Sequence, residues 1–211
     1  MTSAKYIERI QIQGGEPFVY SDWGGVLKYI GKQKNKVHVL TIATNGSIVP
    51  SDDLMRIMHD NDVKIRISNY GRSLDKLAEL TKKCDKFGVQ YSMYDFATGK
   101  TRWFQCGGVD FKREQNNRTV KKRFNDCRFN TCLTLERGEL SHCSRATNSY
   151  HIQGFQRKDS DYLKVSDDKN FKNRLRKYVL FLKPMEACHY CYGTSMDHTI
   201  PVALQEGETR N

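Results

Sequence analysis

Two hydrophobic patterns alternate along residues 7 to about 95. Short runs rich in β-branched and aromatic residues predict strands, and each is followed by a stretch with apolar residues on one helical face. The predicted strands are residues 7–13, 37–44, 63–68 and 89–95. The run VHVLTIAT at 37–44 is almost entirely apolar, as buried parallel strands are. The alternation predicts βαβ units and therefore an α/β fold with a parallel sheet.

Three segments between these strands predict amphipathic helices. The first is SDWGGVLKYIGKQ, with Ser21 or Asp22 as its N-terminal cap. The second is DLMRIMHD, which opens at Asp52 or Asp53. The third, LDKLAELTKKCDKFG, follows Ser73, which we expect to cap it.

The pattern changes after the fourth strand. RWFQCGG, at 102–108, predicts a fifth strand, whereas residues 107–126 are polar without a strong period and predict a linker. The run CRFNTCLTLERGELSHC, at 127–143, predicts two strands joined by a tight turn at Arg137 and Gly138.

A last helix is predicted over NFKNRLRKYVLFLKP, at 170–184. Its apolar residues share one side, which we expect to pack against the protein. They are Phe171, Leu175, Tyr178, Val179 and Leu182. The predicted organisation is a βα core at 1–106, a linker at 107–126, a cysteine-rich hairpin-plus-helix domain at 127–200, and a tail at 201–211.

Composition narrows the class of protein. The chain has no apolar signal core and no run near the roughly 18 apolar residues that a membrane span needs, so we expect a cytoplasmic protein without a membrane partner. Its 35 Lys and Arg against 24 Asp and Glu give a net charge of +11. These basic residues are scattered over several elements, which argues against nucleic acid and favours solvated faces with some affinity for anions.

Polar residues follow the first predicted strand. There Gly14 and Gly15 permit a tight turn and a close backbone approach to a ligand, Glu16 adds a carboxylate, and Pro17 stiffens the exit. Such a turn is able to hold an ammonium group between carbonyl oxygens and the acid. The alternative is a strand-to-helix corner whose Glu16 only favours the next helix N-terminus.

The next two strands also end in small polar side chains. Thr44 and Asn45 end the second, and Ser68 and Asn69 end the third. Carboxyl ends of parallel strands share one edge, where ligands bind in such sheets. We therefore expect these side chains on the same rim as Glu16.

The order Gly-Gly-Glu-Pro, then Thr-Asn-Gly, then Ser-Asn resembles the radical S-adenosylmethionine (SAM) enzymes over residues 7–106. In that family the Gly-Gly-Glu-Pro turn holds the methionine amino group, and later strand ends contact the ribose and carboxylate. The resemblance implies a partial (βα)6 barrel that lacks its first βα unit. It assigns SAM binding to Gly14, Gly15, Glu16, Pro17, Thr44, Asn45, Ser68 and Asn69.

One departure from the family is large. Its Cys-x-x-x-Cys-x-x-Cys loop, which holds the radical-generating cluster, precedes this turn, but none of the thirteen residues before Gly14 is cysteine. Cys84 and Cys106 lie too late and lack the spacing. The chain is a fragment, a split protein or a degenerate relative, and we favour the fragment. As it stands, we expect it to be inactive.

Five cysteines remain, and clustered cysteines in a cytosolic protein point to metal. Ten residues separate Cys127 from Gly138, and four more lead to Cys143, while Cys188 and Cys191 form a Cys-x-x-Cys pair. This spacing resembles the SPASM and twitch extensions of the same family, which hold an auxiliary [4Fe–4S] cluster.

The ligand set implied by that resemblance is Cys127, Cys143, Cys188 and Cys191, with Cys132 as an alternative to Cys127. Zinc suits the same ligands. His142 and His189 lie beside them, and we expect both to be exposed rather than coordinating.

The resemblance implies a radical SAM enzyme in which a 5′-deoxyadenosyl radical removes hydrogen from the substrate. The auxiliary cluster would accept or relay the electron, and a one-electron donor protein would be a partner. The substrate would be a peptide, a carbohydrate or another small molecule, and the basic surface allows an anionic one such as a nucleotide sugar. The alternative is a zinc-binding α/β module that interacts with nucleic acid.

Overall fold

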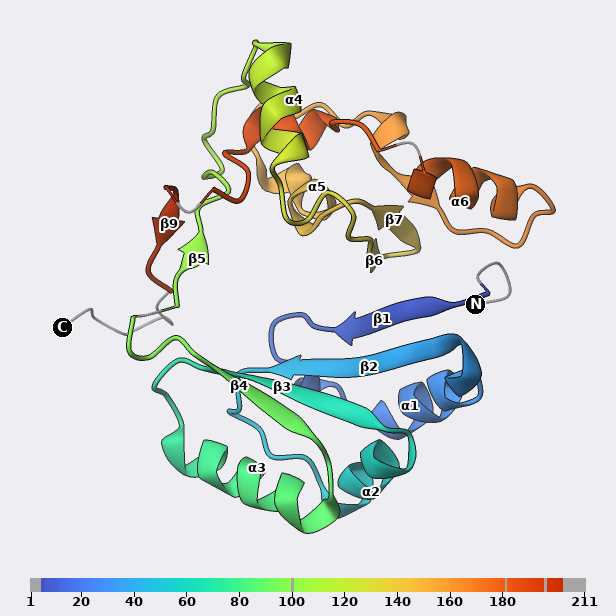
Figure 1. The fold of residues 1–211 in the computed structure, drawn as a ribbon, viewed down its shortest axis with the longest axis vertical. Helices are drawn as coiled ribbons and strands as arrows, with labels where there is room; N and C mark the ends of the chain where they lie inside the picture. The colour runs from blue at the N-terminus through green and yellow to red at the C-terminus, as the bar shows by residue number, and fades with distance from the viewer. Residues whose placement is uncertain (1–4, 100, 181, 196, 203–211) are drawn as a thin grey trace. The chain divides into compact units, whose positions relative to one another are not determined.

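The chain forms two compact units in a computed structural model (Figure 1). The structure describes residues 5–99, 101–180, 182–195 and 197–202. Of the described residues, those up to Arg102 and Val202 belong to the first unit, and the second unit comprises Trp103–Pro201. Each unit is described by itself.

The first unit is a four-stranded parallel sheet with helices packed on it, as the sequence predicts. The strands lie in chain order, so β1 and β4 are the two edges. They are β1 (Ile7–Ile12), β2 (Val37–Thr44), β3 (Val63–Asn69) and β4 (Tyr91–Asp95). The helices that connect them lie on one side of the sheet in Figure 1. They are α1 (Trp23–Gly31), α2 (Asp52–Asp60) and α3 (Leu74–Phe87), with short 3-10 turns η1 (Pro17–Val19) and η2 (Lys34–Lys36).

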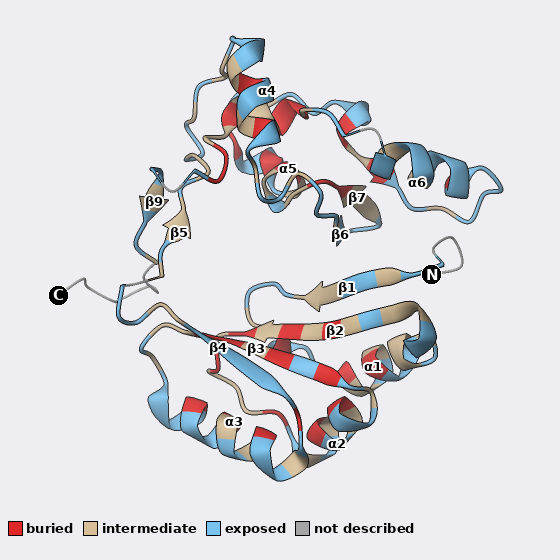
Figure 2. Cartoon of the chain, viewed as in Figure 1, coloured by how far each residue is buried: buried red, intermediate tan, exposed pale blue. Residues whose placement is uncertain are grey.

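One apolar core holds the first unit together. Alternate residues of β2 and β3, such as Ile42 and Ile65, are fully buried against Leu27 of α1, Met58 of α2 and Leu80 of α3. Figure 2 shows these buried positions on the two central strands and on the helix sides that meet them. Burial of each large side chain contributes about 1.5–3 kcal/mol to stability. The residues that are buried here recur with the periods of strands and helices that the sequence shows.

The helix caps agree with the sequence only in part. Asp22 caps α1, accepting a hydrogen bond from Gly25 N at 3.0 Å. Helix α2 begins at Asp52, as predicted, and Ser51 caps it by accepting a hydrogen bond from Leu54 N. Ser73 precedes α3, but its backbone is left-handed (φ 50°) and its side chain makes no capping bond.

The predicted fifth strand does not join the parallel sheet. β5 (Trp103–Phe104) is shorter than predicted and pairs antiparallel with β9 (Thr199–Ile200) in a separate two-stranded sheet of the second unit. The local sequence pattern does not indicate which strand β5 pairs with.

The predicted hairpin is present in the second unit. β6 (Thr134–Glu136) and β7 (Glu139–Ser141) pair antiparallel, and β8 (Leu163–Lys164) adds a third strand. Arg137 and Gly138 form the turn with φ of 49° and 77°, a backbone region that glycine tolerates best. The remaining elements are α5 (Ser144–Thr147), η3 (Ser149–His151), η4 (Asp159–Asp161), α6 (Phe171–Leu180) and η5 (Glu186–Tyr190).

The predicted linker at 107–126 is wrong in its second half, which forms helix α4 (Asn117–Asn125). Asn116 caps the helix through Arg118 N and Thr119 N. Only Val120 and Phe124, four residues apart, are buried. A stripe this narrow gives little periodic signal, which is why the helix was missed.

The predicted packing face of α6 is also only partly correct. Phe171 is buried, but Val179 and Leu182 are 39% and 40% exposed. The predicted tail at 201–211 lies outside the described residues from 203 onward. None of the helices in the described ranges has the length and apolar character needed to cross a bilayer.

Candidate functional site

The Glu16 carboxylate ties the turn after β1 to the end of β2. Its Oε1 accepts hydrogen bonds from Phe18 N at 3.1 Å and Thr44 Oγ1 at 2.8 Å. Its Oε2 accepts one from Asn45 N at 2.8 Å. A carboxylate has about four lone-pair sites, so these three bonds leave it little capacity for a ligand. An ammonium group at this turn would depend mainly on backbone carbonyl oxygens.

Gly14 and Gly15 are both exposed, and the structure gives no internal reason for glycine at either position. A Cβ atom built on either residue meets nothing within 4 Å, and neither residue has a left-handed φ. The space beside the turn is therefore open. Glycine there permits a ligand to approach the backbone closely.

Strand register brings the other polar strand ends to the same edge. Ile12, the last residue of β1, pairs with Ile42, so the turn after β1 begins near the end of β2 at Thr44. Thr44 pairs with Ile67, so Ser68 and Asn69 lie just beyond the end of β2.

The polar side chains at this rim are partly occupied by the protein itself. The Thr44 hydroxyl donates to Glu16 and accepts from Gly46 N at 3.0 Å. Asn45 Oδ1 accepts from Ser47 N, and Asn69 Oδ1 accepts from Gly71 N. Ser68 is buried. The amide NH2 groups of the two asparagines are the donors best suited to a ligand here.

Four of the late cysteines line one cavity of the second unit, about 40 Å³ in volume. They are Cys127, Cys143, Cys188 and Cys191. All seven cysteines of the chain are free thiols. Cys132 is exposed and does not line this cavity, so of the two alternatives for the hairpin ligand the structure places Cys127 with the others.

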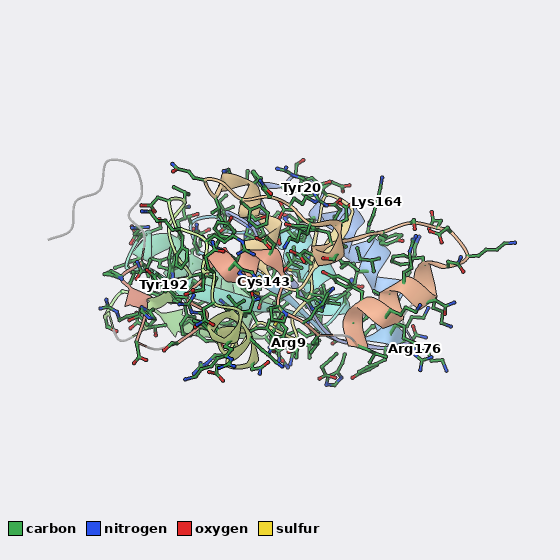
Figure 3. All side chains as sticks on the ribbon, turned by 90° about the horizontal axis from the view of Figure 1, so that it is seen from above. Arg9, Tyr20, Cys143, Lys164, Arg176 and Tyr192 are labelled. Atoms are coloured by element: carbon green, nitrogen blue, oxygen red, sulfur yellow. The ribbon has the colours of Figure 1, made fainter. Side chains whose placement is uncertain are left out.

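Three separate segments present these thiols. Cys127 follows helix α4, Cys143 caps the N-terminus of α5 and is labelled in Figure 3, and Cys188 and Cys191 lie in and just after η5. Three of the sulfurs accept backbone hydrogen bonds: Cys127 from Phe129 N, Cys143 from Ala146 N and Cys191 from Gly193 N, at 3.4, 3.4 and 3.2 Å. N–H donors of this kind stabilise thiolates and tune the metal centres they bind.

Burial keeps two of the thiols protonated when no metal is bound. It raises the pKa of Cys143 to about 11 and that of Cys188 to about 12. Metal ligation requires thiolates, so binding must release these protons. The charge of each thiol also acts on the others, since Cys127 and Cys191 contribute to the raised pKa of both Cys143 and Cys188.

Two arginines supply positive charge to the cavity wall. Arg145 donates to the carbonyl oxygens of Gly107, Gly108 and Tyr190 at 2.7, 2.9 and 2.7 Å. Its Nε is buried, and no partner for it is found in the part of the chain that is described. Arg123 donates to the Cys191 carbonyl oxygen at 3.2 Å. A set of bound thiolates would be negatively charged, and these guanidinium groups offset that charge.

His142 also lines the cavity, but it is not exposed as the sequence predicts: only 4% of its surface is accessible. Its Nε2 donates to Tyr178 O at 3.1 Å, and the ring stacks on Tyr178. Burial lowers the pKa of His142, so the ring is neutral. His189 is half-buried and bonds through Nδ1 to Glu114 O at 2.7 Å.

The cavity suits a thiolate-bound metal centre by the chemistry of its lining: four thiols, backbone N–H groups aimed at sulfur, and two cations. Within the described ranges, no three His, Cys, Asp or Glu side chains are already arranged to hold a single metal ion. Ligation would therefore require the side chains to adjust.

Sequence reasoning missed three residues of this region. Arg123 and Arg145 lie in polar runs without a motif, and Cys106 had been set aside because it has no motif spacing. The thiol of Cys106 lies against Gly193, with its Sγ 3.8 Å from the Gly193 carbonyl oxygen, 87 positions later in the chain. No local signal would have found that contact. The seventh cysteine, Cys84, is buried in the apolar core of the first unit.

Comparison with known proteins leaves the family open: no protein-family model matches the chain, and no similar curated protein is found.

Proposed function

We propose that this chain belongs to a radical SAM enzyme and that its second unit binds an auxiliary [4Fe–4S] cluster through Cys127, Cys143, Cys188 and Cys191. In this proposal the parallel sheet is part of a (βα)6 barrel, and the turn from Gly14 to Pro17 binds the methionine end of SAM. The enzyme would act in the cytoplasm on a peptide, a carbohydrate or another small substrate.

The observation that carries the proposal is that four cysteines from three segments line one cavity. Nothing in their sequence separation forces this, since the first and the last are 64 positions apart. Chance burial of thiols does not explain the backbone N–H groups that point at three of the sulfurs. Each feature is expected of a tetrathiolate metal centre.

The first unit supports the SAM part of the proposal. Glu16 holds the glycine turn against the end of β2, which leaves the Gly14 and Gly15 backbone exposed at the carboxyl edge of the sheet. Asn45 and Asn69 lie at the same edge, each with its amide oxygen fixed by a backbone N–H. The exposed carbonyl groups would bind the ammonium, and the amides would contact the ribose and carboxylate.

The family's cofactors supply one-electron cleavage of SAM to a 5′-deoxyadenosyl radical. The chain itself has no Cys-x-x-x-Cys-x-x-Cys sequence, so its own residues bind and orient SAM and hold the second centre. Four cysteine ligands occupy every protein-facing position of such a centre, which suits electron transfer better than substrate binding.

Anaerobic purification and reconstitution test the cluster. We expect a brown protein with about four iron and four sulfide per chain. Cys132→Ser should keep that content, and Cys143→Ser should lose it. A colourless protein that binds one zinc and no iron would reject the cluster and support the zinc module.

Titration of the full chain with SAM tests the turn. Gly14→Ala adds a methyl group that meets no protein atom within 4 Å, so the fold should tolerate it. We expect SAM to bind about tenfold more weakly, which corresponds to roughly 1.4 kcal/mol. The matched control is Gly24→Ala in α1, whose added methyl group makes only an ordinary contact with Ile57. Equal affinities in the two variants would reject the assignment of this turn.

A further inference from the structure

The helices of the first unit pack on one face of its sheet, and the opposite face is polar (Figure 1). Buried parallel strands are normally apolar on both faces. In β3, however, the core residues alternate with polar ones, which are Lys64, Arg66 and Ser68. We call the side of the sheet that bears these three residues the open face. Its composition suits water or a polar ligand better than a second layer of helices.

The charge on the open face is all positive. Strand register places Arg9 of β1 on the same side of the sheet as Lys64 and Arg66. None of the residues that the four described strands place on this face is Asp or Glu. The carboxylate just before β3, Asp62, is paired with Lys34. Cations gathered without an acidic partner attract anions.

The Arg66 guanidinium is held in place on this face but is only partly satisfied. Its Nη1 donates to Gln11 Oε1 at 3.3 Å, and its Cζ lies 4.9 Å from the centroid of the Tyr94 ring. Its Nε is buried, and no hydrogen-bond partner for it is found in the part of the chain that the structure describes. A buried donor without a partner costs free energy, which an anion bound to the guanidinium would offset.

Small side chains leave room beside Arg66. Its register partners on the neighbouring strands are Ala43 and Ser92. Ser68, two positions further along β3, lies at the edge of the sheet where we propose that SAM binds. Because a strand rises about 3.3 Å per residue, an anion at Arg66 would lie about 7 Å back from that edge.

We propose that the open face binds a phosphate group of the substrate through Arg66, with Lys64 as a second cation. The guanidinium fork matches two phosphate oxygens at once. Lys64 is exposed and its Cα lies about 7 Å along the strand, and two cations at this spacing favour a doubly charged phosphate over a singly charged carboxylate. The inference rests on the proposed function in calling the ligand the substrate, and it narrows that substrate to a small phosphate ester such as a sugar phosphate or a nucleotide.

Calorimetric titration of the metal-free full chain with pyrophosphate tests the site. We expect Arg66→Gln to bind at least tenfold more weakly than the unmodified chain. Arg66→Lys should be intermediate, because lysine keeps the charge but lacks the fork. The control Lys28→Gln removes the same charge from an exposed position of α1, on the helix side of the sheet, and should bind as the unmodified chain does. Equal weakening in Arg66→Gln and Lys28→Gln would reduce the binding to net charge and overturn the site, as would no binding to the unmodified chain.

Titration with acetate distinguishes phosphate from carboxylate. Acetate should bind the unmodified chain at least tenfold more weakly than pyrophosphate does. Equal affinities would overturn the assignment to phosphate.

The arginine Nε–H resonances of the unmodified chain report on the site without relying on how a variant folds. The resonance that is missing in Arg66→Lys should shift when pyrophosphate is added, and a resonance that stays fixed at saturation would overturn the role of Arg66. Neither iron nor SAM is needed for this measurement. A chain that binds pyrophosphate at Arg66 but forms no cluster and binds no SAM would reject the proposed function and keep the phosphate site. A chain that forms the cluster and binds SAM but not pyrophosphate would reject this inference alone.

Discussion

The two units are stabilised in different ways. The first has fourteen buried residues in one apolar cluster, most of them contributed by β2, β3 and the three helices. The cluster beside the cysteine cavity of the second unit contains only Ala146, Met185 and Ala187 as buried members, with Cys143, Phe155 and Cys188 packed against it. Two of those six residues are proposed metal ligands.

Buried polar groups show the opposite distribution. Only two of those found in the described residues, Thr44 and Ser68, belong to the first unit. The second unit contributes Ser141, His142, Ser149, Asp161, Glu186 and Thr194. Buried polar groups favour folding only when they are paired. Asp161, for example, accepts the Glu186 backbone N–H at 2.5 Å, and Tyr178 donates to the Asp161 carbonyl oxygen at 2.7 Å.

The comparison indicates that apolar burial is gathered in one large cluster in the first unit, whereas the cluster beside the cysteines of the second unit is small, so a bound centre would add to the stability there. Small domains with a thin core commonly obtain it from a metal. A centre bound by the four thiols would cross-link the segment after α4 to α5 and η5.

Removal of the bound metal should have the largest effect. A chelator should release the second unit to a state that exchanges its amide protons rapidly, because thiolate metal sites contribute on the order of 10 kcal/mol. The amides of β2 and β3 should stay protected. Hydrogen exchange read by mass spectrometry measures both units in one sample. Equal protection of the second unit with and without metal would contradict the idea that a metal stabilises this unit.

Cys143→Ser should reproduce most of that loss, because serine oxygen is a poor replacement for thiolate at a soft metal site. We expect low metal content and rapid exchange around α5. The matched variant Cys132→Ser alters an exposed thiol outside the cavity and should behave as the unmodified protein. The comparison would be wrong if both variants lost metal equally.

Met58→Ala tests the apolar side of the comparison. Met58 is fully buried in α2, so its truncation should lower the free energy of unfolding of the first unit by roughly 2 to 5 kcal/mol. Leu74→Ala removes similar volume from a residue that is 59% exposed and should change it by less than about 0.5 kcal/mol. Denaturation followed by exchange at β3 gives both values. Metal content should be unaffected in each.

Glu186→Gln should give the smallest effect, in the second unit. The carboxylate is 5% exposed and pairs with Arg113 at 2.6 Å and with Lys158. Arg113 first, and Lys158 next among the cations, hold the pKa of Glu186 at about 2, below its ordinary 4.5. The loss should be on the order of 2 kcal/mol near neutral pH, because both cations are partly exposed.

The pH dependence of that difference gives a sharper test. A lowered pKa in the folded state stabilises the protein above pH 4.5, and this contribution is lost as pH falls toward 2. The unfolding free energies of the unmodified protein and of Glu186→Gln should therefore converge over this interval. A difference that stays constant in acid would show that the ion pair is not its source.

The local sequence pattern was sufficient to predict strands and helices wherever they pack on an apolar core. The strands and helices of the first unit were predicted within a few residues because Ile42, Ile65 and Met58 recur with the periods of buried strands and an amphipathic helix. The hairpin at Arg137 and Gly138 was equally readable. Helix α4 was missed because only Val120 and Phe124 mark its buried side. Its start had a usable signal, an asparagine cap four residues before the first of them.

The sequence identified the residues of the candidate sites through their motifs, but not how these residues are arranged in space. Spacing singled out Cys127 and Cys143 but left Cys132 open, and the shared cavity separates them. Glu16 was predicted either to help hold a ligand's ammonium group or only to favour the next helix N-terminus. In the structure it caps η1 and also accepts hydrogen bonds from Thr44 and Asn45. Those partners lie 28 and 29 positions away, beyond the reach of any local pattern.

By itself, the sequence determined which segments become strands and helices of the first unit, where the hairpin turns, and which residue types are available for metal and cofactor chemistry. These follow from side-chain periodicity and backbone preference within a few residues. Only the tertiary structure decided that four thiols share a cavity with Arg145, and that the Cys106 thiol lies against Gly193. Such contacts depend on the path of the whole chain, because residues far apart in sequence meet only when the elements between them have packed.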